Sequence, residues 1–202
     1  MYKEVGISSN NVPITLSIWY TERSCPTIVF LPGTMSHPLM YENFLSGLCE
    51  RGFNIIGVHY LSHGKSPKIK MNYTMEDLLY NVYDATTYGM ENYGDNIAVM
   101  GSSQGGILAA MAAGRDTRLK AVFPHNIMLT TLKETMSLTK YPAWTHRFMG
   151  LIQWGFRVGG KLLPNYKVPG DAYLDYNKAR LLKRPYAFTL LPFKICRQFI
   201  QC

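Results

Sequence analysis

The chain has 202 residues, of which 47% are hydrophobic and 17% are charged, so it can bury one sizeable core. This balance excludes an intrinsically disordered chain, and no uninterrupted apolar run approaches the length of a membrane span. The formal net charge is +8.

The charge is unevenly distributed. Residues 126–202 hold 12 basic and 3 acidic side chains, whereas residues 1–125 hold 9 and 10. Such asymmetry occurs in proteins that bind nucleic acids or anionic membranes. The basic residues here stand singly among aromatic residues, Leu and Pro, without a basic run. We therefore predict no nucleic-acid partner, and a basic lid over an acyl substrate or near a lipid surface fits the pattern better.

The cysteines indicate the compartment. They lack C-x-x-C and metal-ligand spacing and occupy positions 25, 49, 196 and 202. The first residues contain no apolar signal core. Reduced thiols in a cytoplasmic protein are the prediction.

The first third of the chain predicts strands. Residues 12–19 alternate apolar and polar side chains, which is typical of a strand with one wet face, and residues 2–7 are a candidate antiparallel edge partner. Residues 27–31 and 54–59 are unbroken apolar and β-branched runs, typical of strands covered on both faces.

Helices separate these strands. One is predicted over residues 41–51, before Gly52, and one from Thr74 to about residue 90, where Thr74 and Asp77 form a capping signal. The expected inward side chains are Phe44, Leu45 and Leu48 on the first and Leu78, Val82 and Ala85 on the second.

The same alternation continues to residue 123. A strand over 96–100, a helix over 106–113 and a strand over 119–123 are predicted. Strands that alternate with single helices indicate parallel pairing with helices on both faces, so the fold class is α/β with a doubly wound sheet. Beyond it, helical periodicity appears around 144–157 and 175–184.

The segment 96–106 carries the chemistry. Between its strand and its small-residue helix it reads Gly101-Ser-Ser-Gln-Gly105, the G-x-S-x-G pattern of a nucleophile elbow. A nucleophilic serine must leave the sheet on so tight a turn that residues two positions away on each side must lack a Cβ. This spacing assigns the nucleophile to Ser103. A Gly/Ser turn without chemistry is the alternative, which the flanking strand and helix disfavour.

With this motif in this context, the chain resembles the α/β-hydrolase family, and within it the lysophospholipase- and monoacylglycerol-lipase-like serine hydrolases with a lid. The resemblance runs from about residue 10 to about residue 190. It implies a mostly parallel sheet with a helical lid inserted after the sixth strand. Residues 1–125 would form the core with the elbow, 126–192 the helical lid, and 193–202 a truncated end before a missing C-terminal core.

The resemblance also implies an oxyanion hole. Its donors would be the backbone N–H of Gln104 and that of Thr34, in the turn after the strand over 27–31. Relatives carry His-Gly-x in that turn, whereas this chain reads Pro32-Gly33-Thr34. Because the donor belongs to the main chain, proline in place of histidine leaves the turn plausible. An ordinary strand-ending Pro-Gly is the alternative.

A third match follows the strand over 54–59. Relatives carry Asp-x-Arg-Gly-His-Gly-x-Ser, and this chain reads His59-Tyr-Leu-Ser-His-Gly-Lys-Ser66, with matches at His63, Gly64 and Ser66. The resemblance places this loop near the site but outside the triad. His59 and His63 lack a supporting carboxylate spacing, so no metal is predicted, and the chemistry requires no cofactor.

The rest of the triad is not found. The family order is Ser, then Asp or Glu, then His. No histidine follows His146, and residues 185–202 contain no strand followed by Gly-x-x-Asp. We therefore expect the last two strands, the catalytic acid and the catalytic base to be missing from this chain. His125, His146, Asp171 and Asp175 are internal candidates, and none occupies a position that the family uses for the base.

These features predict a lipase- or esterase-like serine hydrolase that acts on carboxylic esters through an acyl-serine and is inactive or impaired as this 202-residue chain. The alternatives are a non-catalytic acyl-binding module of hydrolase-like fold, and an acyltransferase or thioesterase that uses the same serine. The expected partner is a small acyl ester or lipid-like substrate, the basic lid allows peripheral membrane contact, and the oligomeric state stays open.

Overall fold

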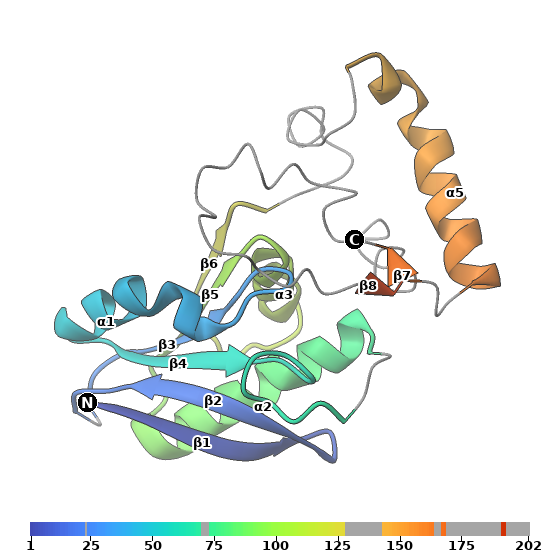
Figure 1. Cartoon of the computed structure of the whole chain (residues 1–202). Coiled ribbons are helices and arrows are strands. Elements are labelled where there is room, and N and C mark those ends of the chain that lie inside the picture. The colour runs from blue at the N-terminus through green and yellow to red at the C-terminus, as the bar shows by residue number, and fades with distance from the viewer. Residues whose placement is uncertain (23, 70–72, 128–142, 164–166, 169–190, 193–202) are drawn as a thin grey trace. The chain divides into compact units, whose positions relative to one another are not determined.

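The computed structural model describes residues 1–127 apart from 23 and 70–72, and then residues 143–163, 167–168 and 191–192 (Figure 1). The chain divides into two compact units, Met1–Ile127 and Met128–Cys202. The first unit contains the predicted elbow and the sheet that carries it.

The sheet of the first unit has six strands in the order β1-β2-β4-β3-β5-β6. They are β1 (Tyr2–Ser9), β2 (Val12–Trp19), β3 (Thr27–Leu31), β4 (Asn54–His59), β5 (Ile97–Ser102) and β6 (Ala121–His125). The hairpin of β1 and β2 joins antiparallel to β4, and β4, β3, β5 and β6 run parallel. The predicted mostly parallel sheet is confirmed.

Helices cover both faces of this sheet. They are α1 (Glu42–Glu50), which follows the 3-10 turn η1 (Pro38–Tyr41), α2 (Met75–Tyr93) and α3 (Gln104–Ala113). Ile55 belongs to an apolar cluster with Leu45 of α1, whereas Ile56 lies against Gly89 of α2. Successive side chains of a strand point to opposite faces, so α1 and α2 lie on opposite sides (Figure 1). Since α3 packs beside α2, the doubly wound arrangement is confirmed.

The start of α2 is a capping box. The backbone N–H of Asp77 donates to Thr74 Oγ1 at 3.1 Å, and the N–H of Thr74 donates to Asp77 Oδ2 at 2.7 Å. These two bonds satisfy donors that the first turn of a helix leaves unpaired. The predicted inner residues of α2 are fully buried, namely Leu78, Val82 and Ala85.

The structure corrects several expectations of detail. The predicted wet face of β2 is wrong in the second half of the strand, because Ser17 and Trp19 are buried there, Ser17 against His59 and Trp19 in the apolar cluster that includes Leu45 of α1. Phe44 is half exposed, since Leu45 takes the inward position on α1. The sixth strand begins two residues later than predicted, at Ala121, where its pairing with Ala98 of β5 starts.

The second unit is described in short pieces. The 3-10 helix η2 (Ala143–Phe148) precedes α5 (Met149–Leu162), and β7 (Lys167–Val168) pairs antiparallel with β8 (Leu191–Pro192). The predicted helical region 144–157 falls on η2 and α5, whereas the one around 175–184 lies outside the described residues. Across the described ranges, no helix has the length and apolarity needed to cross a membrane.

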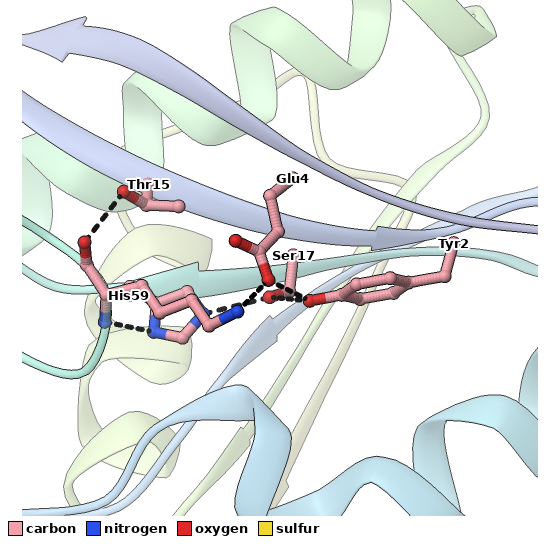
Figure 2. Close-up of polar contacts among 6 residues, drawn as sticks. Tyr2, Glu4, Thr15, Ser17 and His59 are labelled. Atoms are coloured by element: carbon pink, nitrogen blue, oxygen red, sulfur yellow. Dashed lines mark hydrogen bonds and ion pairs between the residues drawn. The ribbon is translucent and has the colours of Figure 1, made fainter.

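A polar network fills the buried side of β2 that the sequence predicted to be wet (Figure 2). His59 at the end of β4 is fully buried, and its Nε2 lies 2.9 Å from Ser17 Oγ. Tyr2 Oη lies 3.0 Å from Ser17 Oγ and donates to Glu4 at 2.6 Å, and Glu4 pairs with Lys65. This network ties the hairpin of β1 and β2 to the loop after β4.

The tautomer of His59 follows from its partners. The backbone N–H of Lys65 donates to His59 Nδ1 at 3.1 Å, so Nδ1 is an acceptor and Nε2 carries the proton that is donated to Ser17. A second proton on Nδ1 would face the N–H of Lys65. The pKa of His59 is lowered to about 4, mainly by burial. The charges of His37 and Lys65 also lower this pKa, and together they outweigh the opposite effect of Glu4.

This depressed pKa predicts a loss of stability in mild acid. An unfolded histidine takes up a proton near pH 6.5 and native His59 only near pH 4, so the free energy of unfolding should fall across that window, by roughly 3 kcal/mol from this group alone. The His59→Gln variant keeps a donor and an acceptor but does not titrate there. Urea unfolding at pH 7 and pH 4 should therefore show a smaller difference for His59→Gln than for the parent.

The matched control is His125→Gln, because the His125 side chain is exposed. It should retain the pH dependence of the parent chain. Equal pH dependence in His59→Gln and the parent would contradict the prediction.

Candidate functional site

The candidate site lies at the carboxyl ends of β3 and β5. These two strands are neighbours, yet the helices that follow them, α1 and α3, pack on opposite faces. The chain therefore turns away from the sheet in opposite directions at this point, which leaves a crevice in doubly wound folds and commonly holds their ligands.

Ser103 stands alone between β5 and α3. Its backbone has φ 54° and ψ −114°, a left-handed conformation that costs a non-glycine residue on the order of 1–3 kcal/mol. The backbone N–H of Ser103 donates to the His125 carbonyl at 2.9 Å, and the Ser103 carbonyl accepts from the Ile107 N–H at 3.2 Å. Strand β6 and helix α3 thus hold the strained residue in place.

The two glycines of the elbow allow the turn to be this tight. A Cβ on Gly101 would overlap the carbonyl of Gly105, and a Cβ on Gly105 would overlap the carbonyl of Leu31 at the end of β3. The atoms in the way are backbone atoms, which cannot rotate aside. Both glycines are required where the sequence placed them.

At the start of α3, no described residue accepts a hydrogen bond from the Gln104 N–H. The first backbone N–H groups of a helix have no acceptor within the helix, and the Ser103 side chain forms no capping bond to them. The N–H of Gln104 belongs to this first turn, at the positive end of the helix dipole. The Gln104 side chain is buried, with its Nε2 3.8 Å from Met75 Sδ of α2, so it is packed into the fold.

The turn after β3 lies beside the serine. A Cβ built on Gly33 would lie 3.4 Å from Ser103 Cβ and 3.4 Å from the Ser102 carbonyl oxygen. The Gly33 carbonyl accepts from Ser36 Oγ at 2.7 Å and from the Ser36 N–H at 3.2 Å. Thr34, the predicted second donor, follows Gly33 directly and so belongs to the turn that approaches Ser103.

None of the described histidines forms a hydrogen bond with Ser103 through its side chain. His125 ends β6 with an exposed side chain, and its carbonyl binds the Ser103 N–H. His63 Nδ1 lies 2.9 Å from the Leu61 carbonyl and its Nε2 lies 3.2 Å from Tyr73 Oη. Within the described part of the chain, no residue forms a hydrogen bond with the Ser103 hydroxyl. The side chain of His146 and the residues Asp171 and Asp175 lie outside what the structure describes.

No cluster of metal-binding side chains is found in the described ranges, where three or more His, Cys, Asp or Glu residues never gather. His37 and His59 are neighbours, and their stacked rings have centroids 5.8 Å apart. Burial is the main cause of the lowered pKa of both imidazoles.

Sequence reasoning missed the groups that hold the turn after β3. Tyr60 is fully buried and donates to the Pro32 carbonyl at 3.2 Å, and Ser36 binds the next carbonyl along the chain. The only sequence feature that pointed to a buried, structural role for Tyr60 was its position directly after a buried strand. Neither residue belongs to a motif, because their partners are backbone atoms that only the fold brings near.

Comparison with known proteins identifies the architecture. A sequence profile for the alpha/beta hydrolase fold matches residues 26–156. No curated protein matches the chain significantly in sequence. Among solved structures, Est1E from Butyrivibrio proteoclasticus with bound ferulic acid is similar, with 17% identity and a TM-score of 0.64, over 98% of this chain and 71% of Est1E.

Two further structures show the same likeness. The Pyrococcus furiosus esterase Pf2001 is 20% identical with a TM-score of 0.56, over 75% of this chain and 64% of the esterase. DcsB, solved with a substrate analogue, is 18% identical with a TM-score of 0.61, over 84% of this chain and 58% of DcsB. The chain thus spans less than two thirds of the length of Pf2001 and of DcsB. At these identities the likeness shows the fold.

The elbow predicts a specific intolerance to a methyl group. Gly105→Ala should destabilise the chain by about 1–3 kcal/mol or more, because the new Cβ meets the backbone of β3. Gly114→Ala is the matched control at the other end of α3, where φ is −75° and the nearest atoms are 3.7 Å from a built Cβ. Urea midpoints should fall for Gly105→Ala and hold or rise for Gly114→Ala. Equal midpoints would contradict the assignment of this turn.

Proposed function

Because the chain belongs to the alpha/beta hydrolase family, we propose that it is a serine hydrolase that cleaves carboxylic esters through Ser103. The observation that carries this proposal is the strained backbone of Ser103 at the carboxyl edge of the sheet. Such strain persists where the surrounding structure over-determines it, and it concentrates at functional sites. The esterases among the structural neighbours are consistent with an ester substrate.

In the proposed reaction, Ser103 Oγ attacks the ester carbonyl carbon while a base accepts the hydroxyl proton. The carbonyl oxygen becomes an oxyanion that accepts hydrogen bonds from the N–H groups of Gln104 and Thr34. The tetrahedral intermediate collapses to an acyl-serine, and the alcohol leaves with a proton. Water then attacks the acyl-serine in the same way and releases the acid.

Two alternatives use the same scaffold. An acyltransferase or thioesterase would form the same acyl-serine and differ in the leaving group or the acceptor, and the thioesterase domain from the curacin biosynthetic pathway is among the structural neighbours. A non-catalytic acyl-binding module would keep the pocket without covalent chemistry. The glycine-lined elbow, and a Gln104 N–H that no described residue accepts, favour catalysis over binding alone.

We also propose a slow reaction for the 202-residue chain. None of the described residues bonds to the Ser103 hydroxyl as a base would, and a triad without its base retains an acceleration on the order of 10³–10⁴ over water. That remainder comes from the oxyanion hole and substrate binding. Lysophospholipase-like lipid esters are the proposed substrate class, on the resemblance of the motifs.

The proposed organisation assigns residues 1–125 to the core, 126–192 to a lid and 193–202 to the segment that follows it. Cys25 and Cys49 are free thiols, which supports a cytoplasmic location. In the lid segment, Leu151, Trp154 and Leu162 of α5 are exposed beside the exposed cations Arg157 and Lys161. An apolar helical stripe flanked by basic residues supports peripheral contact with an anionic lipid surface.

The nucleophile assignment predicts a single labelled residue. A fluorophosphonate reagent should add once per chain at Ser103, as read by intact mass and peptide mapping, and Ser103→Ala should abolish the label. Ser102→Ala is the matched control, since Ser102 occupies the variable position of the motif, and it should still be labelled.

Nitrophenyl acetate completes the experiment. We expect Ser103-dependent turnover well below the median enzyme value of roughly 10 s⁻¹. Absence of both labelling and Ser103-dependent turnover would support the non-catalytic module. Turnover at ordinary enzyme rates would show that a base such as His125 or His146 acts on Ser103.

Lipid contact is tested by vesicle sedimentation. The chain should bind phosphatidylcholine vesicles more tightly when they contain phosphatidylserine, and Arg157→Glu with Lys161→Glu should weaken binding by roughly 30-fold. Lys3→Glu with Lys120→Glu is the control for total charge, because both residues lie on the first unit. Equal weakening by the two double variants would contradict a role for α5.

A further inference from the structure

In the turn after β3, the carbonyls of two successive residues, Pro32 and Gly33, each accept a hydrogen bond from a side-chain hydroxyl. Tyr60 Oη donates to the Pro32 carbonyl at 3.2 Å, and Ser36 Oγ donates to the Gly33 carbonyl at 2.7 Å. Pro32 has no N–H, so its carbonyl is its sole main-chain hydrogen-bonding group. Two side-chain hydroxyls thus act on a turn of a few residues.

The Ser36 bond has a direct geometric consequence. The Gly33 carbonyl and the Thr34 N–H belong to one peptide group, which is planar and trans, so the two point in opposite directions. Whatever fixes the direction of the Gly33 oxygen therefore fixes the direction of the Thr34 hydrogen. Ser36 holds that oxygen twice, through its hydroxyl and through its backbone N–H at 3.2 Å.

We propose that Ser36 is a positioning residue for the oxyanion hole, which aims the Thr34 N–H at the reacting carbonyl by holding the Gly33 oxygen. This inference rests on the proposed esterase function. Ser36 itself touches no substrate. Its hydroxyl restrains the rotation of one peptide group, and that peptide group supplies the donor.

Tyr60 fixes the position of the turn that Ser36 orients. The Pro32 oxygen lies between the Tyr60 hydroxyl and the elbow, since a Cβ built on Gly105 would lie 2.7 Å from it. Tyr60 is fully buried, and burial raises the pKa of its phenol, so the hydroxyl stays protonated and continues to donate. Tyr60 anchors the start of the turn against β5 and α3, and Ser36 sets the plane of the next peptide.

Besides the Gly33 carbonyl, Ser36 has Tyr41 as a neighbour. Its hydroxyl lies 3.4 Å from Ser36 Oγ and 3.5 Å from a Cβ built on Gly33. Tyr41 is the last residue of η1, and its ring packs edge-on against that of Phe30 on β3, with the ring centroids 4.9 Å apart. The partly buried Ser36 hydroxyl therefore lies between the Gly33 carbonyl and the Tyr41 hydroxyl, and these two contacts favour the rotamer that holds the Gly33 oxygen.

The test compares three variants with the parent chain in nitrophenyl acetate hydrolysis. Ser36→Ala should lower kcat about two- to tenfold with KM nearly unchanged, because one neutral hydrogen bond is lost and the donor is loosened rather than removed. Ser36→Thr keeps the hydroxyl and should recover most of kcat. Ser46→Ala is the matched control, because Ser46 Oγ also bonds a carbonyl three residues back, that of Asn43 on α1, at 3.4 Å. It should leave kcat unchanged.

A tetrahedral analogue separates positioning from general weakening of the fold. A trifluoromethyl ketone adds to the serine hydroxyl and presents an oxyanion, whereas the corresponding carboxylate product stays planar. Ser36→Ala should weaken inhibition by the ketone by the same factor as kcat and leave product inhibition unchanged. Thermal unfolding identifies a temperature at which all variants are folded, and the assays are run below it.

The outcomes are distinct. If Ser103→Ala keeps full activity, the proposed function and this inference both fail. If Ser103→Ala is inactive and Ser36→Ala keeps its kcat, the inference alone fails. It also fails if Ser36→Ala changes KM rather than kcat, or loses kcat without a matching loss of affinity for the ketone.

Discussion

The site depends on one close approach between two backbones. At Gly105 the elbow lies so near the Leu31 carbonyl of β3 that no side chain fits between them. This contact draws the turn after β3 against Ser103 and makes the two carboxyl ends one surface. It also forces Ser103 into a left-handed conformation, which hydrogen bonds to β6 and α3 hold. The strain at the serine and the proximity of the turn are therefore two results of the same constraint.

Residues at the end of β4 support that turn from a neighbouring strand. Burial acts on two neighbouring residues there in complementary ways. It keeps His59 neutral, with Nδ1 as acceptor and Nε2 as donor, and it keeps Tyr60 protonated, with its hydroxyl on Pro32. His37 ends the turn segment and stacks on His59, so the hairpin of β1 and β2, the end of β4 and the turn form a continuous packed region.

The proposed nucleophile and oxyanion donors come from two adjacent strand ends. Ser103 and the helix start at Gln104 follow β5, and the turn at Thr34 follows β3, so the fold places side by side the groups that the proposed acyl transfer would use. The polarised charge of the chain belongs to the other unit, where α5 carries cations beside exposed apolar side chains. The proposed chemistry and the proposed lipid contact therefore belong to different segments of the sequence.

Local patterns predict the alternation of strands and helices, the elbow and its serine, because hydrophobic periodicity and the spacing of Gly101 and Gly105 need no distant partner. Features that depend on neighbours distant in the chain emerge only from the fold. Ser17 of β2 is buried because the side chains of Tyr2 and His59 contact it across the sheet, and Phe44 stayed half exposed because Leu45 filled the inward position. The partners of Ser17, Ser36 and Tyr60 were likewise invisible, since a side chain that bonds to a backbone atom or lies across a sheet leaves no pattern in sequence.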